Sequence, residues 1–534
     1  MASWLGSWLE WLGGKAGLQT LVLGGSPRAD SAPLRAELFT ADQMAQHGRE
    51  LAVAHELIRG RAPDRLLARL ASNEKVLIEV CALLARNAES NRRVTPAGEW
   101  LLDNFYLIEE EIRTAKRHLP AGYSRELPRL KSGPSAGLPR VYDLALQTVA
   151  HGDGRVGRGT LSRFVSSYQT EKVLNLGELW AIPIMLRLAL IENLRRVGAA
   201  VAADRSERNL ADQWADKMLD VAEKDPKGLI LVIADMARSD PPMTGAFVSE
   251  LARRLQGRSA ALALPLTWIE QRLAESNENI EQMVQAEAQH QAAAQVSVSN
   301  SIGSLRLLGS MDWREFVETL SLVEQALRED PANVYARMDF ATRDSYRHAI
   351  EKMAKRSPLS EAELARETIR LAADAAGRLP GDDLRHTHVG YYLTSSGRPE
   401  LERAAKVRVS AAHLWRRRMK QAPLRPYAGS LMGLSLLLTV GAGWWASDAW
   451  QRDLYSARPG WWLVAAGLVL LLANSQLALS LTNWFVGFLT KPHALPRMDF
   501  SFGIPPSART LVVVPTNCQA ASRGSWVSVS SVMT

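Results

Sequence analysis

The sequence PYAGSLMGLSLLLTVGAGWWAS occupies residues 426–447, and PGWWLVAAGLVLLLANSQLALSLTNWFVGFLT occupies residues 459–490. Neither stretch contains a charged residue. A helix rises about 1.5 Å per residue, so about 20 apolar residues cross a hydrocarbon core of about 30 Å. Both stretches exceed that length, and tryptophans near their ends suit the headgroup level of a bilayer. Residues 426–490 are therefore predicted to form a transmembrane helical hairpin. The alternative is a pair of core helices in a soluble domain.

Flanking charges predict the orientation of this hairpin. Residues 408–425 carry six Lys or Arg and no acidic residue, whereas the loop 448–458 carries two Arg and two Asp. The side richer in Lys and Arg is cytoplasmic. We therefore expect the long N-terminal region to be cytosolic, the loop 448–458 to face outward, and the lipid bilayer to be the main partner.

Three polar residues, Asn474, Ser475 and Gln476, interrupt the second apolar stretch. Polar groups at that depth usually form hydrogen bonds with a neighbouring helix. A lining for a solute path is the alternative.

The composition excludes several classes of protein. The 534 residues allow two or three domains, and the net charge of +8 is concentrated next to the first apolar stretch. This position suits anionic lipid better than nucleic acid, so no nucleic-acid partner is expected. The two cysteines, Cys81 and Cys518, provide neither a disulfide framework nor a cysteine-based metal site.

Residues 1–30 are expected to form an amphipathic segment, because Trp4, Trp8 and Trp11 recur at helical spacing. The segment could lie in a membrane interface or pack on the following domain. Glu10 and Lys15 interrupt it, which argues against a signal peptide.

Residues 31–300 are predicted to form a helical domain, followed by a second helical segment with the basic juxtamembrane region at 301–425. Thr95 is a good N-cap for a helix that begins at Pro96, and an apolar face from Leu101 to Ala115 continues that helix. The run 180–191 is apolar on almost every face apart from Pro183 and Arg187, so it is predicted to lie at the centre of the core.

Few residues suggest chemistry. The run 109–111 is three glutamates, a composition compatible with acid chemistry or metal binding. Asp153 lies between glycines beside Arg155, an arrangement compatible with a phosphate-binding turn. A solvated helix face and an ordinary loop are the favoured interpretations, because neither place has a recognisable motif spacing. The sequence therefore predicts no catalytic, cofactor-binding or metal-ligating residue, and no cofactor bound to this chain.

The run Leu511 to Val514, followed by Pro515, predicts a strand buried on both faces, of the kind that opens an α/β domain. One strand cannot bury itself, and the nineteen residues after Pro515 contain no second apolar strand. The predicted fold class is therefore mainly α, with one strand left from an α/β domain.

Five strings in the chain resemble the N-terminal third of bacterial cyclic β-1,2-glucan synthases. They are DNFYLIEEEIRTAKRHLPAGYSRELPRL (103–130), LGELWAIPIMLRLALIENLRR (176–196), DPANVYARMDFATRDSYR (330–347), HVGYYL (388–393) and LPRMDFSFGIPPSARTLVVVPT (495–516). The resemblance covers about residues 1–516.

The resemblance implies a glycosyltransferase of the bacterial inner membrane. Such enzymes polymerise glucose from UDP-glucose, with a divalent metal, into a β-1,2-linked chain and cyclise it. It also implies that the loop 448–458 is periplasmic and that residues 491–516 begin the transferase domain, whose catalytic residues all lie further along. No residue of this sequence is therefore assigned a catalytic, donor-binding or metal-binding role, and the chain alone is expected to be inactive.

After Thr516 the resemblance ends, and the serine-rich residues 517–534 are expected to be an aberrant tail from a frameshifted or prematurely terminated reading frame. Besides the bilayer, the expected partners are the missing transferase region and other membrane helices. The alternative function is a non-catalytic, membrane-tethered helical scaffold or interaction protein. A transporter is disfavoured because two spans rarely form a solute path.

Overall fold

The structure is a computed structural model. It describes residues 32–58, 63, 65–90, 92–119, 122–378, 385–409, 424–453, 461–489, 495–501, 503–506 and 509. The chain forms two compact units, Met1–Ala326 and Leu327–Thr534. The amphipathic segment 1–30, the strand 511–514 and the tail 517–534 predicted from the sequence lie outside the described residues.

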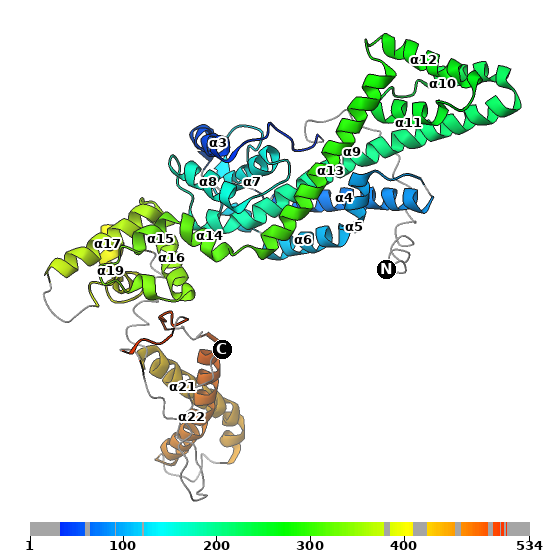
Figure 1. The fold of residues 1–534 in the computed structure, drawn as a ribbon. Coiled ribbons are helices and arrows are strands. Elements are labelled where there is room, and N and C mark those ends of the chain that lie inside the picture. The colour runs from blue at the N-terminus through cyan, green and yellow to red at the C-terminus, as the bar shows by residue number, and fades with distance from the viewer. Residues whose placement is uncertain are drawn as a thin grey trace, which may run out of the picture. The chain divides into compact units, whose positions relative to one another are not determined.

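The first unit is helical apart from one small sheet (Figure 1). Its elements in chain order are α3 (Ala41–Ala54), β1 (Leu57–Ile58), α4 (Leu66–Glu89), α5 (Pro96–Asp103), α6 (Phe105–His118), η1 (Tyr123–Arg125), β2 (Arg129–Leu130), α7 (Arg140–His151), α8 (Arg158–Gln169), α9 (Leu176–Lys224), η2 (Pro226–Gly228), α10 (Leu229–Ser239), α11 (Gly245–Leu255), η3 (Ala260–Leu262), α12 (Ala263–Ala274), α13 (Ile280–Ser310), α14 (Trp313–Leu320) and α15 (Leu322–Leu327). The strands β1 and β2 pair in antiparallel register, with Leu57 opposite Leu130.

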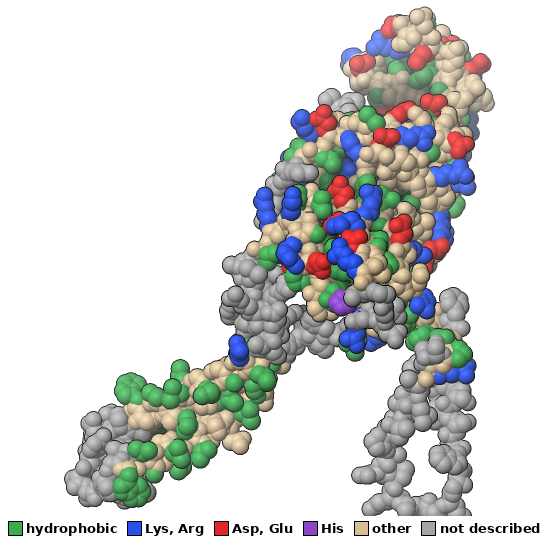
Figure 2. Space-filling model, turned by 90° about the vertical axis from the view of Figure 1, so that its left-hand side faces the viewer, with side chains coloured by type: hydrophobic (Ala, Val, Ile, Leu, Met, Phe, Trp, Pro, Cys, Tyr) green, Lys and Arg blue, Asp and Glu red, His purple; other side chains and the backbone are tan. Residues whose placement is uncertain are grey.

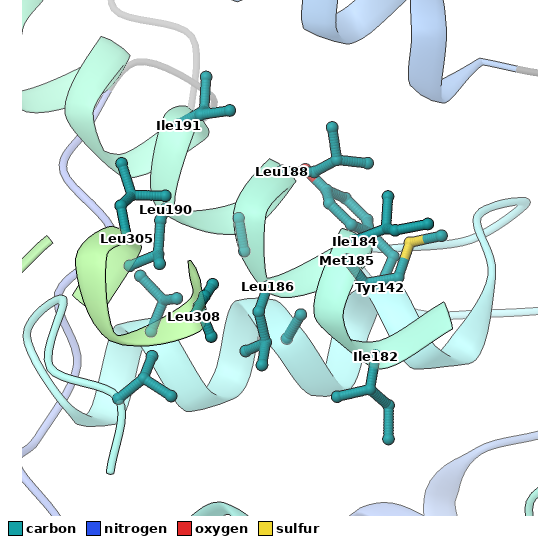
Figure 3. Packing of buried hydrophobic residues seen from close by; sticks show 14 of the residues in the cluster. Tyr142, Ile182, Ile184, Met185, Leu186, Leu188, Leu190, Ile191, Leu305 and Leu308 are labelled. Carbon is teal, nitrogen blue, oxygen red and sulfur yellow. The ribbon is translucent and has the colours of Figure 1, made fainter. Parts of the chain in front are cut away.

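Helix α9, 49 residues long, organises this unit. Its N-terminus is closed by a capping box between Asn175 and Glu178. From Ala181 to Ile191 every side chain except Arg187 is buried, against α7 on one side and α13 on another (Figure 3). The predicted position of residues 180–191 at the centre of the core is therefore confirmed.

The second half of α9 belongs to a separate hydrophobic core. Ala211, Ala215 and Met218 pack there with side chains of α10, α11 and α12 and with Ile280 at the start of α13. Because α9 supplies residues to both cores, it is the structural axis of the first unit.

The helix predicted to continue from Pro96 to Ala115 is instead two helices, α5 and α6. Thr95 is the N-cap as expected, and its hydroxyl accepts a hydrogen bond from the backbone N–H of Gly98 at 3.4 Å. The break is at Asn104, whose side-chain amide donates to the carbonyl of Trp100 at 2.9 Å. Asparagine side chains compete in this way with the backbone hydrogen bonds of a helix. The prediction of one continuous helix was wrong at this residue.

The second unit contains the remaining elements, η4 (Tyr335–Arg337), α16 (Phe340–Ala354), α17 (Glu361–Arg378), α18 (Val389–Thr394), α19 (Arg398–Ala404), α21 (Leu424–Asp453) and α22 (Trp461–Leu489). Helix α21 continues through Asp453, so the first half of the predicted loop 448–458 is helical. Helix α13 of the first unit runs through position 300, where the sequence placed a domain boundary. The functional division of the chain into domains stays a prediction.

Candidate membrane hairpin and polar clusters

The two long apolar helices, α21 and α22, are candidate membrane spans by length and composition, and their surface is largely exposed. Their candidate spans are Leu424–Trp445 and Val464–Phe488, and only 6% of each is buried. Large apolar side chains such as Leu437, Val464 and Leu472 are more than 60% exposed. Figure 2 shows hydrophobic side chains covering the visible face of this hairpin. Core helices of a soluble domain would bury most of these side chains.

Small and polar side chains form the contact between the two helices. Ser435, Ala478 and Thr482 are the side chains buried there, at 7%, 0% and 5% exposure. The amide of Asn474 donates to the hydroxyl of Thr439 at 3.4 Å. The contact between the two helices is therefore small and polar. Of the three polar residues expected to bond a neighbouring helix, Asn474 does so, whereas Ser475 donates to the carbonyl of Leu472 in its own helix and Gln476 is exposed. At the end of the hairpin near residue 427, Tyr427 donates to the side-chain oxygen of Asn483 at 2.9 Å.

The chain beyond α22 returns to the helical part of the second unit. Met338 and Met498 form an isolated antiparallel bridge. The N–H of Asp339 donates to the carbonyl of Arg497 at 3.0 Å, and the N–H of Asp499 donates to the carbonyl of Arg337 at 2.8 Å. Backbone pairing thus fixes residues 497–499 to the start of α16.

A buried carboxylate organises the same part of the chain. Asp330 is 2% exposed and accepts hydrogen bonds from the backbone N–H groups of Val334, Tyr335 and Val389. Nδ1 of His388 lies 2.8 Å from its Oδ2 atom. Burial alone would raise the pKa of Asp330, but the hydrogen bond and charge of His388 and the backbone donors outweigh it and lower the pKa below its ordinary value.

Helix α9 holds another buried carboxylate, Glu192, which has no exposed surface. Its oxygens accept hydrogen bonds from Arg69 at 2.9 and 3.1 Å, Asn73 at 2.7 Å, Arg195 at 2.9 Å and Arg196 at 2.8 Å. Burial raises the pKa of Glu192, but the hydrogen bonds and charges of the arginines lower it to about 2. All four partners bond the ionised form, so Glu192 connects α4 to α9 and is not a free acid.

Two of the glutamates at 109–111 have separate partners, and the third, Glu110, is exposed. Glu109 pairs on the surface with Arg113, one helical turn away, as a solvated face predicts. Glu111 is buried, contrary to that expectation, and accepts a hydrogen bond from Nε of Arg187 at 2.6 Å. Arg187 is the charged residue within the apolar run of α9. Glu111 and Arg187 therefore neutralise each other's charge inside the core. The three glutamates do not converge on one site.

Asp153 is in a tight turn packed on α13. It has φ 45° and pairs with Arg35 at 3.2 Å. Gly154 follows with φ 80°, and a Cβ atom there would lie 2.4 Å from Oγ of Ser301. Ser304 donates to the carbonyl of Gly154 at 2.7 Å. The turn has a packing role. Its carboxylate pairs with Arg35, and Arg155, the cation that the sequence places beside Asp153, is exposed.

Among the residues that the structure describes, one cluster has the residue types of a metal site. The ligand atoms of Asp204, Glu287 and His290 lie within 4.8 Å of one another. Arg208 already forms an ion pair with Glu287. The hydrogen bond and charge of Asp204 raise the pKa of His290, although burial opposes them. The guanidinium of Arg208, already paired with Glu287, opposes a bound cation, so an ion-pair network describes this cluster better.

Sequence reasoning missed Glu192, Asp330 and His388. The available signal was that all three are polar residues within the strings that carry the family resemblance. Two of these strings, 330–347 and 388–393, are in contact through the pair between Asp330 and His388.

Comparison with known proteins gave one informative relationship. No family model matches the chain. Over 494 residues, 92% of its length, the chain is 32% identical to cyclic β-(1,2)-glucan synthase NdvB of Rhizobium meliloti (strain 1021). The chain is homologous to a region of a cyclic β-(1,2)-glucan synthase. It spans 17% of the length of that relative. The resemblance found in the sequence is thereby confirmed for this region.

Proposed function

We propose that this chain forms the helical and membrane-anchoring part of a cyclic β-1,2-glucan synthase in the bacterial inner membrane. The observation that carries the proposal is the homology to NdvB, which extends over 92% of the chain and so includes most of both helical units and the hairpin. The apolar outer surface of α21 and α22 supports insertion into a bilayer.

In this proposal the helical parts are cytosolic, and the residues between α21 and α22 are periplasmic, because Lys and Arg predominate at 408–425. The hairpin anchors the chain. The backbone pairing of residues 337–339 with 497–499 then holds the chain that leaves the membrane against a rigid helical support.

We further propose that this chain alone transfers no glucose. Transfer from UDP-glucose requires groups that stabilise the departing diphosphate and a base aligned with the acceptor hydroxyl. The buried carboxylates described above, Glu192 and Asp330, are fully engaged by arginines, by a histidine and by backbone donors. Neither is available as a base or a metal ligand.

Two assays test the proposal in a bacterium that lacks its own synthase. Membranes containing this chain and radiolabelled UDP-glucose should yield no glucan above the empty-membrane background, whereas full-length NdvB provides the positive control. Glucan formation, or label on this polypeptide, would show that the active site has been misplaced.

The second assay uses a chimera in which this chain replaces the homologous region of NdvB. We expect the chimera to make cyclic glucan, because the helical units and hairpin serve the same purpose in both. The alternative, a membrane-tethered scaffold unrelated to glucan synthesis, predicts a chimera that is inserted in the membrane and inactive.

A further inference from the structure

The C-terminal end of α16 lies beside the chain that follows α19. The carbonyl of Arg356 accepts a hydrogen bond from the N–H of Arg408 at 2.9 Å, and the hydroxyl of Ser357 donates to the carbonyl of Ala405 at 2.6 Å. Exposed cations gather within about one helical turn of these contacts along the chain. We call them the basic surface: Lys352, Lys355, Arg356, Arg403, Lys406 and Arg408.

Carboxylates balance only part of this charge. Glu351 pairs with Lys355 at 3.0 Å, whereas Glu402 is buried and pairs with Arg398. Helix C-termini favour Lys and Arg, yet that effect falls off within the last turn, and α19 ends at Ala404. Within the part of the chain that the structure describes, four cations of the basic surface have no carboxylate at ion-pair distance: Lys352, Arg356, Lys406 and Arg408. The basic surface therefore has charge left over for a partner.

Two covalent connections hold the basic surface near the hairpin. On one side Arg408 begins the run 408–425, which carries six Lys or Arg and no acidic residue and leads into α21. On the other side the carbonyl of Arg497, eight positions after Leu489 at the end of α22, accepts from the N–H of Asp339 at the start of α16. Eight residues span at most about 29 Å. Helix α16 is thus kept close to the face of the bilayer at which α22 ends.

We propose that the basic surface binds anionic phospholipid headgroups of the cytoplasmic leaflet and lays the end of α16 on the membrane. The inference rests on the proposed insertion and orientation of the hairpin. The cytoplasmic leaflet has a negative surface potential, and each Lys or Arg that reaches it contributes about five-fold to binding. Because the hairpin keeps the basic surface close to its target, a few such cations suffice. The membrane contact thereby extends from the linear basic run to a folded part of the second unit.

Quenching of a dye by a labelled lipid tests this contact. The full chain is reconstituted into vesicles of phosphatidylcholine, with or without phosphatidylglycerol, that contain a lipid with a nitroxide on its headgroup. Cys518 is replaced by serine, and Cys81 is kept because burial raises the pKa of its thiol to about 12, which makes it unreactive. The dye is attached to Ala404→Cys, an exposed position next to Arg403. Phosphatidylglycerol should increase the quenching, and high salt should reverse the increase.

Ala376→Cys is the matched control for the position of the dye. Ala376 is exposed in the last turn of α17, about 22 Å from the start of that helix, which follows the basic surface in the chain. A dye at this position should be quenched equally with and without phosphatidylglycerol.

Neutralising two cations tests the role of the charge. Lys352→Gln together with Arg356→Gln should lower the ratio of bound to free basic surface about 25-fold in vesicles that contain phosphatidylglycerol. Both residues lie outside the run 408–425, so the loss would belong to the folded surface. Arg117→Gln together with Arg258→Gln removes the same charge from exposed positions of the first unit and should change the quenching little.

Quenching at Ala404→Cys that is the same with and without phosphatidylglycerol would overturn the proposal and favour an acidic protein surface as the partner. An equal response at Ala376→Cys, or an equal loss with the Arg117 and Arg258 substitutions, would overturn it as well. In each of these cases the membrane anchor stands. Alkaline carbonate extraction identifies the other failure: if carbonate releases the chain from the vesicles, the proposed insertion is wrong and the lipid contact is wrong with it.

Discussion

Nδ1 of His388 lies 2.8 Å from the carboxylate of Asp330, although 58 positions separate these residues in the sequence. The same carboxylate binds the N–H groups that open η4 and α18. One side chain therefore fixes the starts of two helical segments, and its removal should loosen both.

Replacing Asp330 by asparagine should destabilise this part of the second unit by about 2 kcal/mol, because hydrogen bonds to a buried charged group are lost. Hydrogen–deuterium exchange of the full chain should show faster exchange of the amides at the starts of η4 and α18. Asp374→Asn, which breaks a surface pair with Arg370, is the control and should change exchange little. Equal protection in the two variants would contradict the assigned role.

Replacing Glu192 by leucine should cost the first unit about 3–5 kcal/mol, since three arginines lose their buried counter-charge. Denaturant unfolding followed by circular dichroism measures the loss. Glu109→Gln, on the exposed pair with Arg113, should cost less than about 0.5 kcal/mol. A Glu192→Leu variant as stable as the parent chain would mean that the cluster contributes nothing net.

Glu192 also predicts a pH dependence. The pKa of Glu192 in the folded state is about 2, below the value of about 4.3 expected in the unfolded chain. The ionised carboxylate therefore contributes its full stabilisation of the folded state at pH values above about 4.3. That contribution should decline as the pH falls from about 4.3 towards 2. The stability difference between the parent chain and Glu192→Gln should therefore be constant from pH 7 to pH 5 and shrink below it. A difference that widens with acidification would have the wrong sign.

Replacing Asp499 by proline should release the chain that follows the hairpin, because proline has no N–H to donate to the carbonyl of Arg337. Limited proteolysis should then cut near residues 495–501 at least several-fold faster. Asp499→Asn retains the backbone donor and is the matched control. If both variants resist protease equally, the backbone pairing does not hold this segment.

Membrane topology can be checked by placing a cysteine at Ser456, in the sequence between the two apolar stretches. An impermeant thiol reagent should label Ser456→Cys in intact spheroplasts, since the charge asymmetry places this loop outside. A cysteine at Ser357, in the helical part of the second unit, is the control and should react only after lysis. The reverse pattern would invert the orientation.

The sequence predicted the features that depend on local pattern. The Thr95 cap, the buried run in α9 and the two long apolar helices all follow from spacing and composition, and the structure confirms each. The break at Asn104 was missed because its side chain bonds both its own turn, at the carbonyl of Trp100, and a distant residue, Arg306, which donates to its Oδ1 at 2.6 Å. Periodicity carries no information on either bond.

The sequence also could not predict which residues from different helices would form ion pairs with each other. Glu111 was expected to face solvent, yet it reaches Arg187 of α9, and nothing in the local pattern of α6 distinguishes it from Glu109. For the same reason the sequence could not foresee the pair between Asp330 and His388, although it placed both residues within conspicuous strings.

Helix α9 supplies side chains to two hydrophobic cores without interruption, from Leu176 to Lys224. Between Ala202, the last of its residues in the first core, and Ala211, the first in the second, the backbone keeps its helical hydrogen bonds, and there is no linker at which the cores could rotate against each other. The two hydrophobic cores are therefore expected to move together, because a displacement of one is carried to the other through the continuous helix.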